Sequence, residues 1–141
     1  DEIPLSLLAR AVVDFNKKQG KEIPKIEVCD GIPLHEVSDF LKSISIFVLT
    51  SYYEGFPTVL LEAAANGNAL VSTKFDGFSD EVLKDKHNGY VVDFSVKAFS
   101  EKIQKLIDDG ALLVSMQKQS LEVIRAYLDE YKVIERWENA L

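Results

Sequence analysis

Short apolar runs that alternate with helical patterns constrain the fold of this chain more than any other feature. Three runs are brief and apolar, and the first is rich in β-branched residues: 44–49, 69–73 and 90–92. Such runs are typical of parallel strands covered by helices on both faces, and the run 44–49 is predicted to be a central strand. The sequence therefore predicts an α/β fold with a parallel sheet and flanking helices.

The remaining elements follow from apolar spacing and from the positions of Gly and Pro. Leu5, Leu8, Val12 and Phe15 recur at helical spacing and are expected to form the apolar face of a first helix. The expected elements are helix 5–19, strand 26–29, helix 34–42, strand 44–49, helix 58–66, strand 69–73, short helix 79–84, strand 90–92, helix 96–107, helix about 111–129 and a last segment about 131–140. Ligands in such folds bind at the carboxyl ends of the strands, so the loop after Leu49 is a candidate site.

Length and charge limit the function classes open to the chain. Its 141 residues are 47% apolar and 28% charged, which predicts one domain over 1–141, with C-terminal helices at about 111–141. The net charge of −7 argues against nucleic acid, because phosphate binding needs a basic face. The same charge argues against contact between this segment and an anionic membrane surface.

Cysteine usage and the absence of targeting signals favour a cytoplasmic location. Cys29 is the single cysteine, so the chain cannot form an internal disulfide. No run is long and apolar enough to span a membrane. Because the chain begins at Asp1 without Met, it is interpreted as a fragment of a longer protein.

The turn between the run 44–49 and the next helix has the composition of an anion site. Gly55 permits a tight turn that a ligand can approach closely, and Pro57 suits the first position of a helix. The free backbone amides near Phe56, Thr58 and Val59 then point outward, and the helix dipole adds positive potential. A helix start of this kind accepts phosphate, which matters here because local groups must hold an anion in an acidic chain.

Two glutamates, Glu54 and Glu62, lie eight positions apart across this turn. Glu62 is about one turn into the helix and shares a face with residues 58 and 65. From there its carboxylate can accept two hydrogen bonds from a cis-diol, as acidic residues do for ribose in dinucleotide folds. Spacing alone leaves the alternatives open: Glu62 as a solvated helix residue, Glu54 as a loop charge, and Thr58 as a cap-region hydroxyl. The two tyrosines before Glu54 can equally be packing groups rather than base-stacking groups.

Taken in order, several motifs of the chain resemble a known family. They are Ile46-Phe47-Val48-Leu49-Thr50-Ser51, Glu54-Gly55-Phe56-Pro57, Val59-Leu60-Leu61-Glu62-Ala63, Gly67, Leu70-Val71-Ser72, Gly77, Glu81-Val82 and Asn88-Gly89-Tyr90-Val91-Val92. This set resembles the C-terminal lobe of retaining GT-B glycosyltransferases of family 4, the group 1 transferases, over roughly 26–141. The resemblance implies a Rossmann-like parallel sheet that forms part of the C-terminal lobe of a GT-B fold.

The resemblance also implies roles for the residues of the turn. Glu54 would be the catalytic glutamate near the hydroxyls of the donor sugar, and Glu62 would bind the nucleotide ribose. The donor phosphate and sugar would face the backbone of Gly55, Phe56, Pro57, Thr58 and Val59. The family transfers a sugar from a nucleoside diphosphate sugar, such as a UDP- or GDP-sugar, with retention at the anomeric carbon. It implies no metal and no cofactor besides the donor substrate, and it implies cytoplasmic assembly of a polysaccharide, glycan or glycolipid.

The chain departs from the family pattern at its start. The lobe normally opens with a strand that carries Gly-Arg and then Lys, whose cations hold the diphosphate, and nothing before Leu5 supplies them. The following strand and the N-terminal acceptor lobe are missing as well, and the family's Gly-Gly is Asp76-Gly77 here. These missing parts indicate a fragment, or a natural truncation that repacks. Together with the resemblance, they lead us to expect the donor-binding part of a glycosyltransferase. The alternative is a non-catalytic nucleotide-sugar-binding or assembly module that lacks its catalytic partner lobe.

Overall fold

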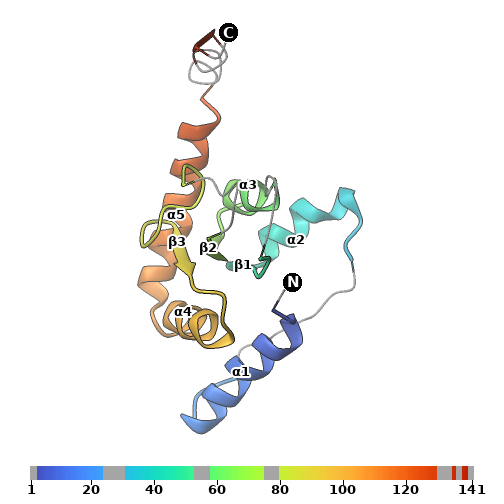
Figure 1. The fold of residues 1–141 in the computed structure, drawn as a ribbon, viewed down its shortest axis with the longest axis vertical. Helices are drawn as coiled ribbons and strands as arrows, with labels where there is room; N and C mark the ends of the chain where they lie inside the picture. The colour runs from blue at the N-terminus through green and yellow to red at the C-terminus, as the bar shows by residue number, and fades with distance from the viewer. Residues whose placement is uncertain are drawn as a thin grey trace.

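The computed structural model describes residues 3–23, 31–52, 58–74 and 80–129, together with 135, 138 and 139. The expected strand 26–29 and most of the expected segment 131–140 lie outside the described residues. The elements are α1 (Leu5–Lys18), a 3-10 turn (Leu34–Glu36), α2 (Val37–Ser43), β1 (Ile46–Leu49), α3 (Thr58–Ala65), β2 (Ala69–Thr73), β3 (Gly89–Val92), α4 (Val96–Asp108) and α5 (Gly110–Tyr127). Helices lie on both sides of the strands, and α5 is the longest of them (Figure 1).

The strands of the described part form one parallel sheet in the order β1-β2-β3. β2 pairs with β1 on one side, with Leu49 opposite Ser72, and with β3 on the other, with Thr73 opposite Val92. This arrangement confirms the predicted α/β class and its parallel sheet.

The prediction that the run 44–49 forms a central strand is wrong within the described residues. β1 lies at one edge of the sheet and its four residues are only half-buried, whereas β2 lies in the middle and is buried throughout. Both runs are apolar, and an apolar run indicates burial without telling which strand has a neighbour on each side.

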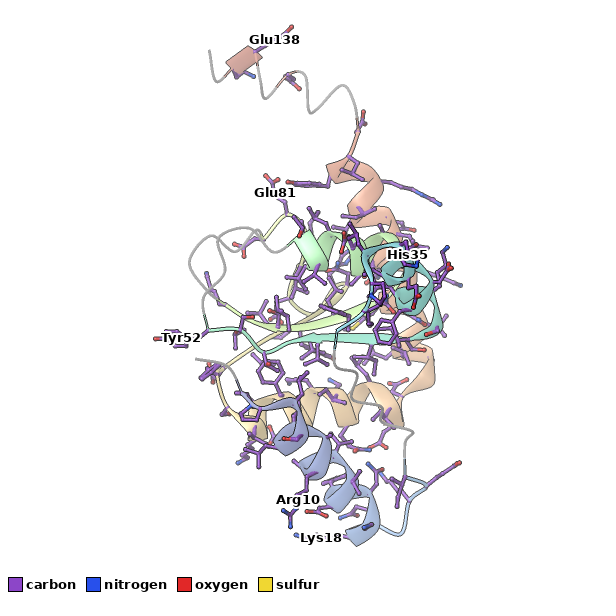
Figure 2. The ribbon with its side chains drawn as sticks, turned by 90° about the vertical axis from the view of Figure 1, so that its right-hand side faces the viewer. Arg10, Lys18, His35, Tyr52, Glu81 and Glu138 are labelled. Carbon is purple, nitrogen blue, oxygen red and sulfur yellow. The ribbon has the colours of Figure 1, made fainter. Side chains whose placement is uncertain are left out.

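Side chains of the strands alternate between two cores, because successive residues of a strand point to opposite faces. The first core lies against α1 and α4, and its strand residues are Ile46, Val48, Ala69, Val71, Tyr90 and Val92. The second core lies against α2 and α3, and its strand residues are Phe47, Leu49, Leu70 and Val91. Figure 2 shows this three-layer arrangement, with the sheet between the helices of the two faces.

α5 lies across the amino ends of β2 and β3 and joins the two cores. The buried hydroxyl of Ser120 lies 2.7 Å from the carbonyl oxygen of Asn68 and 3.3 Å from that of Asn88, the residues that directly precede these strands. Met116 packs into the first core and Ile124 into the second. The carboxyl ends of the strands therefore lie at the end of the sheet away from these α5 contacts.

Two glycines are required by the backbone around β2. Gly67, two residues after the end of α3, has φ +77°, a left-handed conformation that confirms its predicted role as a C-terminal cap. At Gly89 a Cβ would collide with the backbone carbonyl of Leu70, so β3 can pair closely with β2 only if the residue has no side chain.

The predicted short helix over 79–84 is wrong for its described residues, which form a turn from Asp80 to Val82. The cause is the buried side chain of Asn88. Its amide nitrogen donates to the carbonyl of Val82 at 2.8 Å, and its amide oxygen accepts from the backbone N–H of Lys84 at 2.8 Å. These two bonds satisfy the backbone carbonyl of Val82 and the backbone N–H of Lys84 without a helix. The side chain of Asn88 therefore determines the path of the chain into β3.

The apolar face predicted for α1 is correct at its centre and wrong at its ends. Leu8 and Val12 are buried, but Leu5 and Phe15 are 52% and 42% exposed. Asn16 takes the next inward position and is buried, because its side chain pairs with Gln104 of α4. The amide nitrogen of Asn16 donates to Gln104 at 2.7 Å, and that of Gln104 donates back at 3.2 Å.

A salt bridge extends this amide pair to the surface. Gln104 also donates to one carboxylate oxygen of Asp108 at 2.9 Å, and Lys21 donates to the other at 2.8 Å. The hydrogen bonds from Lys21 and then Gln104 lower the pKa of Asp108 below its usual value, because they favour the charged carboxylate. A carboxyl group with a lowered folded-state pKa stabilises the fold at neutral pH, and its contribution is lost as the pH falls through that folded-state pKa.

Among the described residues, no helix combines the length and the apolar character that a membrane crossing requires.

We expect Gln104→Leu to lower the free energy of unfolding by about 1–3 kcal/mol, because the buried amide oxygen of Asn16 loses its donor. Urea unfolding followed by circular dichroism would measure the change. Gln119→Leu on α5 is the control, since the side chain of Gln119 forms no hydrogen bond within the described residues. The double variant Asn16→Leu/Gln104→Leu should regain part of the loss, and strict additivity of the two single losses would contradict the pairing.

Candidate functional site

The carboxyl ends of the three strands lie together at one end of the sheet. This end is called the edge below, and it differs from the lateral edge that β1 forms. β1 is followed by Thr50, Ser51 and Tyr52, β2 by Lys74, and β3 by Asp93. Figure 2 shows Tyr52 pointing outward at this end of the sheet, away from α5. This edge is where α/β sheets of this type bind ligands, so its residues define the candidate site.

Buried hydroxyl groups fix the chain as it leaves β1. The hydroxyl of Thr73, the last residue of β2, donates to the carbonyl of Ser51 at 2.6 Å. The hydroxyl of Thr50 donates to the carbonyl of Ile3 at 3.1 Å, and the backbone N–H of Ile3 donates to the carbonyl of Thr50 at 3.4 Å. Thr50, Ser51 and Thr73 are each at most 5% exposed. The start of the turn is therefore tied both to the central strand and to the chain just before α1.

Tyr52 packs against Phe94 across this edge. The ring centroids are 5.2 Å apart and the rings meet edge to face, which is a favourable geometry for aromatic pairs. Phe94 lies two residues after β3, so the contact spans the end of β2 and joins the loops of both neighbouring strands. For Tyr52 the structure favours the packing interpretation over base stacking, although 62% of the residue remains exposed.

α3 begins at Thr58 and places Glu62 on its outer face. Leu60, Ala63 and Ala64 are buried against the second core, and residues 58, 62 and 65 are all exposed. This confirms that these three positions share a face. Because a helix rises 1.5 Å per residue, the carboxylate-bearing Glu62 lies about 6 Å along the axis from Thr58.

The predicted site residues divide into two groups. Glu54, Gly55, Phe56 and Pro57 lie outside the described residues, so their predicted roles remain predictions. Thr58, Val59 and Glu62 are described: Thr58 and Glu62 are exposed on α3, and Val59 is half-buried.

Sequence reasoning missed Thr73 and Phe94, which hold Ser51 and Tyr52. A polar residue at the end of the buried run 69–73 was the available signal for Thr73. Nothing in the pattern pointed to Phe94. Among the described residues, no three His, Cys, Asp or Glu side chains gather closely enough to hold a metal ion.

A family model confirms the resemblance. The model described as glycosyl transferases group 1 matches residues 16–123 of this chain. This match covers the end of α1 through most of α5, and it includes β1, α3 and β2, which frame the candidate site.

Curated proteins similar to this chain are bacterial glycosyltransferases. The N,N'-diacetylbacillosaminyl-diphospho-undecaprenol α-1,3-N-acetylgalactosaminyltransferase of Campylobacter jejuni is 31% identical over 102 residues, which cover 72% of this chain and 27% of that protein. The putative teichuronic acid biosynthesis glycosyltransferase TuaC of Bacillus subtilis is 31% identical over 105 residues, 74% of this chain and 27% of its own length. The chain thus spans about a quarter of the length of these relatives.

Solved structures share the fold. TarM superposes with a TM-score of 0.71 at 17% identity, over 98% of this chain and 33% of TarM. The C-terminal domain of the group 1 glycosyl transferase LpcC from Francisella tularensis superposes with a TM-score of 0.64 at 25% identity, over 88% of this chain and 64% of that domain. The likeness to TarM supports the predicted GT-B fold class, because it extends over nearly the whole chain.

We expect Thr73→Val to lower the free energy of unfolding by about 1 kcal/mol, because it removes the buried hydrogen bond to the carbonyl of Ser51 while nearly keeping the side-chain shape. Thermal and urea unfolding would measure the loss. Thr73→Ser keeps the hydroxyl and is the control. If the Val variant were as stable as the unmodified chain, the hydrogen bond would not contribute to stability.

Proposed function

Because the chain belongs to the group 1 glycosyl transferases, we propose that it is the donor-binding part of a retaining glycosyltransferase. The complete enzyme would move a sugar from a nucleoside diphosphate sugar to a glycan or a lipid-linked acceptor. The observation that carries this proposal is the unit β1–α3–β2, in which a helix start and the exposed carboxylate of Glu62 follow the carboxyl end of a parallel strand.

The start of α3 suits the diphosphate of the donor. The first amides of a helix have no acceptor within the helix and carry the positive end of the helix dipole. Thr58 is the first residue of α3 and is exposed, so this end is accessible from solvent. Both properties favour a bound phosphate at this position.

Glu62 suits the nucleotide ribose. Its carboxylate is exposed on the same face as Thr58, about 6 Å further along the helix. A phosphate at the helix start and a cis-diol one turn further along would therefore contact a single face of α3. A carboxylate is the group that reads a ribose diol in dinucleotide folds, because its two oxygens accept two hydrogen bonds.

Proteins of similar fold support a nucleotide-sugar donor. Anabaena Alr3699/HepE, solved in complex with UDP and glucose, superposes on this chain with a TM-score of 0.63. The pneumococcal O-GlcNAc transferase GtfA, solved in complex with UDP and GlcNAc, superposes with a TM-score of 0.62. For this chain we propose a UDP- or GDP-sugar donor, without a metal or further cofactor. The acceptor would bind to an N-terminal lobe of the longer, cytoplasmic protein.

In the proposed reaction the leaving phosphate assists attack of the acceptor on the same face of the sugar, which retains the anomeric configuration. The chain would contribute orientation and electrostatic stabilisation rather than a covalent intermediate. Glu54 would stabilise the donor sugar, while Glu62 and the backbone from Gly55 to Val59 would hold the nucleotide and phosphate.

We expect Glu62→Gln to weaken UDP or GDP binding by about 1–3 kcal/mol, because a charged hydrogen-bond acceptor for the ribose is lost. Isothermal titration calorimetry on this chain would measure the affinity. Glu122→Gln on the exposed side of α5 is the matched control and should leave the affinity unchanged. An unchanged affinity in Glu62→Gln would refute the ribose role.

We expect Glu54→Gln in the complete protein to lower the rate of sugar transfer by on the order of a hundredfold, the effect of removing one stabilising group from a transition state. Nucleotide affinity should stay within about twofold of the unmodified protein, because the glutamate acts on the sugar. Equal loss of both properties would contradict this assignment. A complete protein that binds nucleotide and transfers no sugar would indicate the alternative function, a non-catalytic binding module.

A further inference from the structure

Lys74 is the only cation among the described residues that directly follow a strand. β1 is followed by Thr50, Ser51 and Tyr52, and β3 is followed by Asp93. Lys74 is exposed and forms no ion pair within the described part of the chain. A cation at the ligand-binding edge of an acidic sheet domain calls for a physical explanation.

The register places Lys74 beside the start of the candidate site. Leu49 lies opposite Ser72, so continuing the register by two residues sets Ser51 opposite Lys74. The bond from the Thr73 hydroxyl to the carbonyl of Ser51 shows that the two chains stay paired at this level. Neighbouring strands are about 4.8 Å apart, so the backbone of Lys74 lies about that far from the chain that leads into α3.

The backbone that carries Lys74 is fixed rather than free. Thr73 is 2% exposed, pairs with Val92 on one side and bonds to Ser51 on the other. Lys74 therefore extends a flexible, charged side chain from a rigid, central position. That combination suits a group that must reach a ligand at the edge of the sheet without a change in the fold.

We propose that Lys74 supplies the positive charge that holds the diphosphate of the donor. This inference rests on the proposed function, because it assigns Lys74 to the diphosphate of the proposed nucleotide-sugar donor. The chain has a net charge of −7, so long-range electrostatics oppose a diphosphate, and a local cation must offset this repulsion together with the start of α3. A lysine ammonium binds phosphate as a compact point charge.

Asp93 offers a competing explanation for Lys74. The pairing of Thr73 with Val92 sets Asp93 opposite Lys74 one residue further on, on the side away from Ser51. Both residues are described, and their side chains form no ion pair with each other. If Lys74 served only to balance Asp93, its loss would change stability without changing diphosphate binding, and the two roles are therefore separable.

The test compares diphosphate nucleotides with nucleosides, which lack the phosphates. Calorimetry would measure the affinity of UDP, GDP, uridine and guanosine for this chain, for Lys74→Gln and for Lys118→Gln, a matched exposed lysine on α5. We expect Lys74→Gln to weaken the preferred diphosphate about tenfold or more, the scale of a lost charged hydrogen bond. Nucleoside binding should not change, and Lys118→Gln should behave like the unmodified chain.

Two further measurements sharpen the outcome. The affinity for the diphosphate should fall with added salt in the unmodified chain and fall less in Lys74→Gln, because an exposed ion pair is screened. Asp93→Asn should tighten diphosphate binding, because it removes a negative charge beside Lys74. Diphosphate affinity that is the same in Lys74→Gln and in the unmodified chain would overturn the inference.

The failure of this inference differs from the failure of the proposed function. If Lys74→Gln binds the diphosphate normally while Glu62→Gln binds it weakly, the donor site stands and Lys74 is not part of it. If the unmodified chain binds neither UDP nor GDP at millimolar concentration, both the donor site and the role of Lys74 are overturned.

Discussion

Burial of β2 between two parallel neighbours is the constraint on which the rest of the structure depends. Each residue of this strand is buried, and its backbone is paired on both sides, so its position determines those of β1 and β3. Pairing in parallel aligns the carboxyl ends of all three strands at one edge. The candidate site exists because the chain leaves β1 at this edge, forms α3 and returns to the amino end of β2.

Polar side chains position the ends of the strands, while apolar side chains fill the space between them. At the amino end, Ser120 contacts the residues before β2 and β3, and Asn88 holds the turn that leads into β3. At the carboxyl end, Thr50 and Thr73 do the same for the exit of β1. These side chains form hydrogen bonds with backbone carbonyl and N–H groups at or near the strand ends. Buried backbone polar groups need such partners.

The sequence predicts the parts of this structure that depend on local periodicity. The α/β class, the bounds of α3 near 58–65 and the left-handed Gly67 were each visible in spacing or residue type. The exposed face shared by residues 58, 62 and 65 followed from the same periodicity. Strand order did not follow, because β1 and β2 are both apolar runs and only β2 has a neighbour on each side within the described sheet.

Bonds between distant residues could not be predicted from local patterns. Asn16 pairs with Gln104 across 88 positions. Asn16 is therefore the buried residue at the end of α1, where Phe15 was expected. Thr73 reaches Ser51 across 22 positions. In the sequence, Asn16 and Thr73 look like ordinary polar residues. Their structural role is seen only once the fold brings their hydrogen-bond partners next to them.

In the proposed donor complex, the electrostatics of the edge would separate recognition of the nucleoside from recognition of the phosphates. The carboxylate of Glu62 accepts hydrogen bonds, which suits hydroxyl groups and repels an anion, so in this proposal it would lie away from the diphosphate. Its place about one turn beyond Thr58 meets this condition, because the positive end of the α3 dipole then lies between the carboxylate and the strand ends. Lys74 stands at the strand end on the other side of the turn, opposite Ser51. A diphosphate between Lys74 and the start of α3 would meet positive potential from both sides, while its ribose would extend along α3 to Glu62.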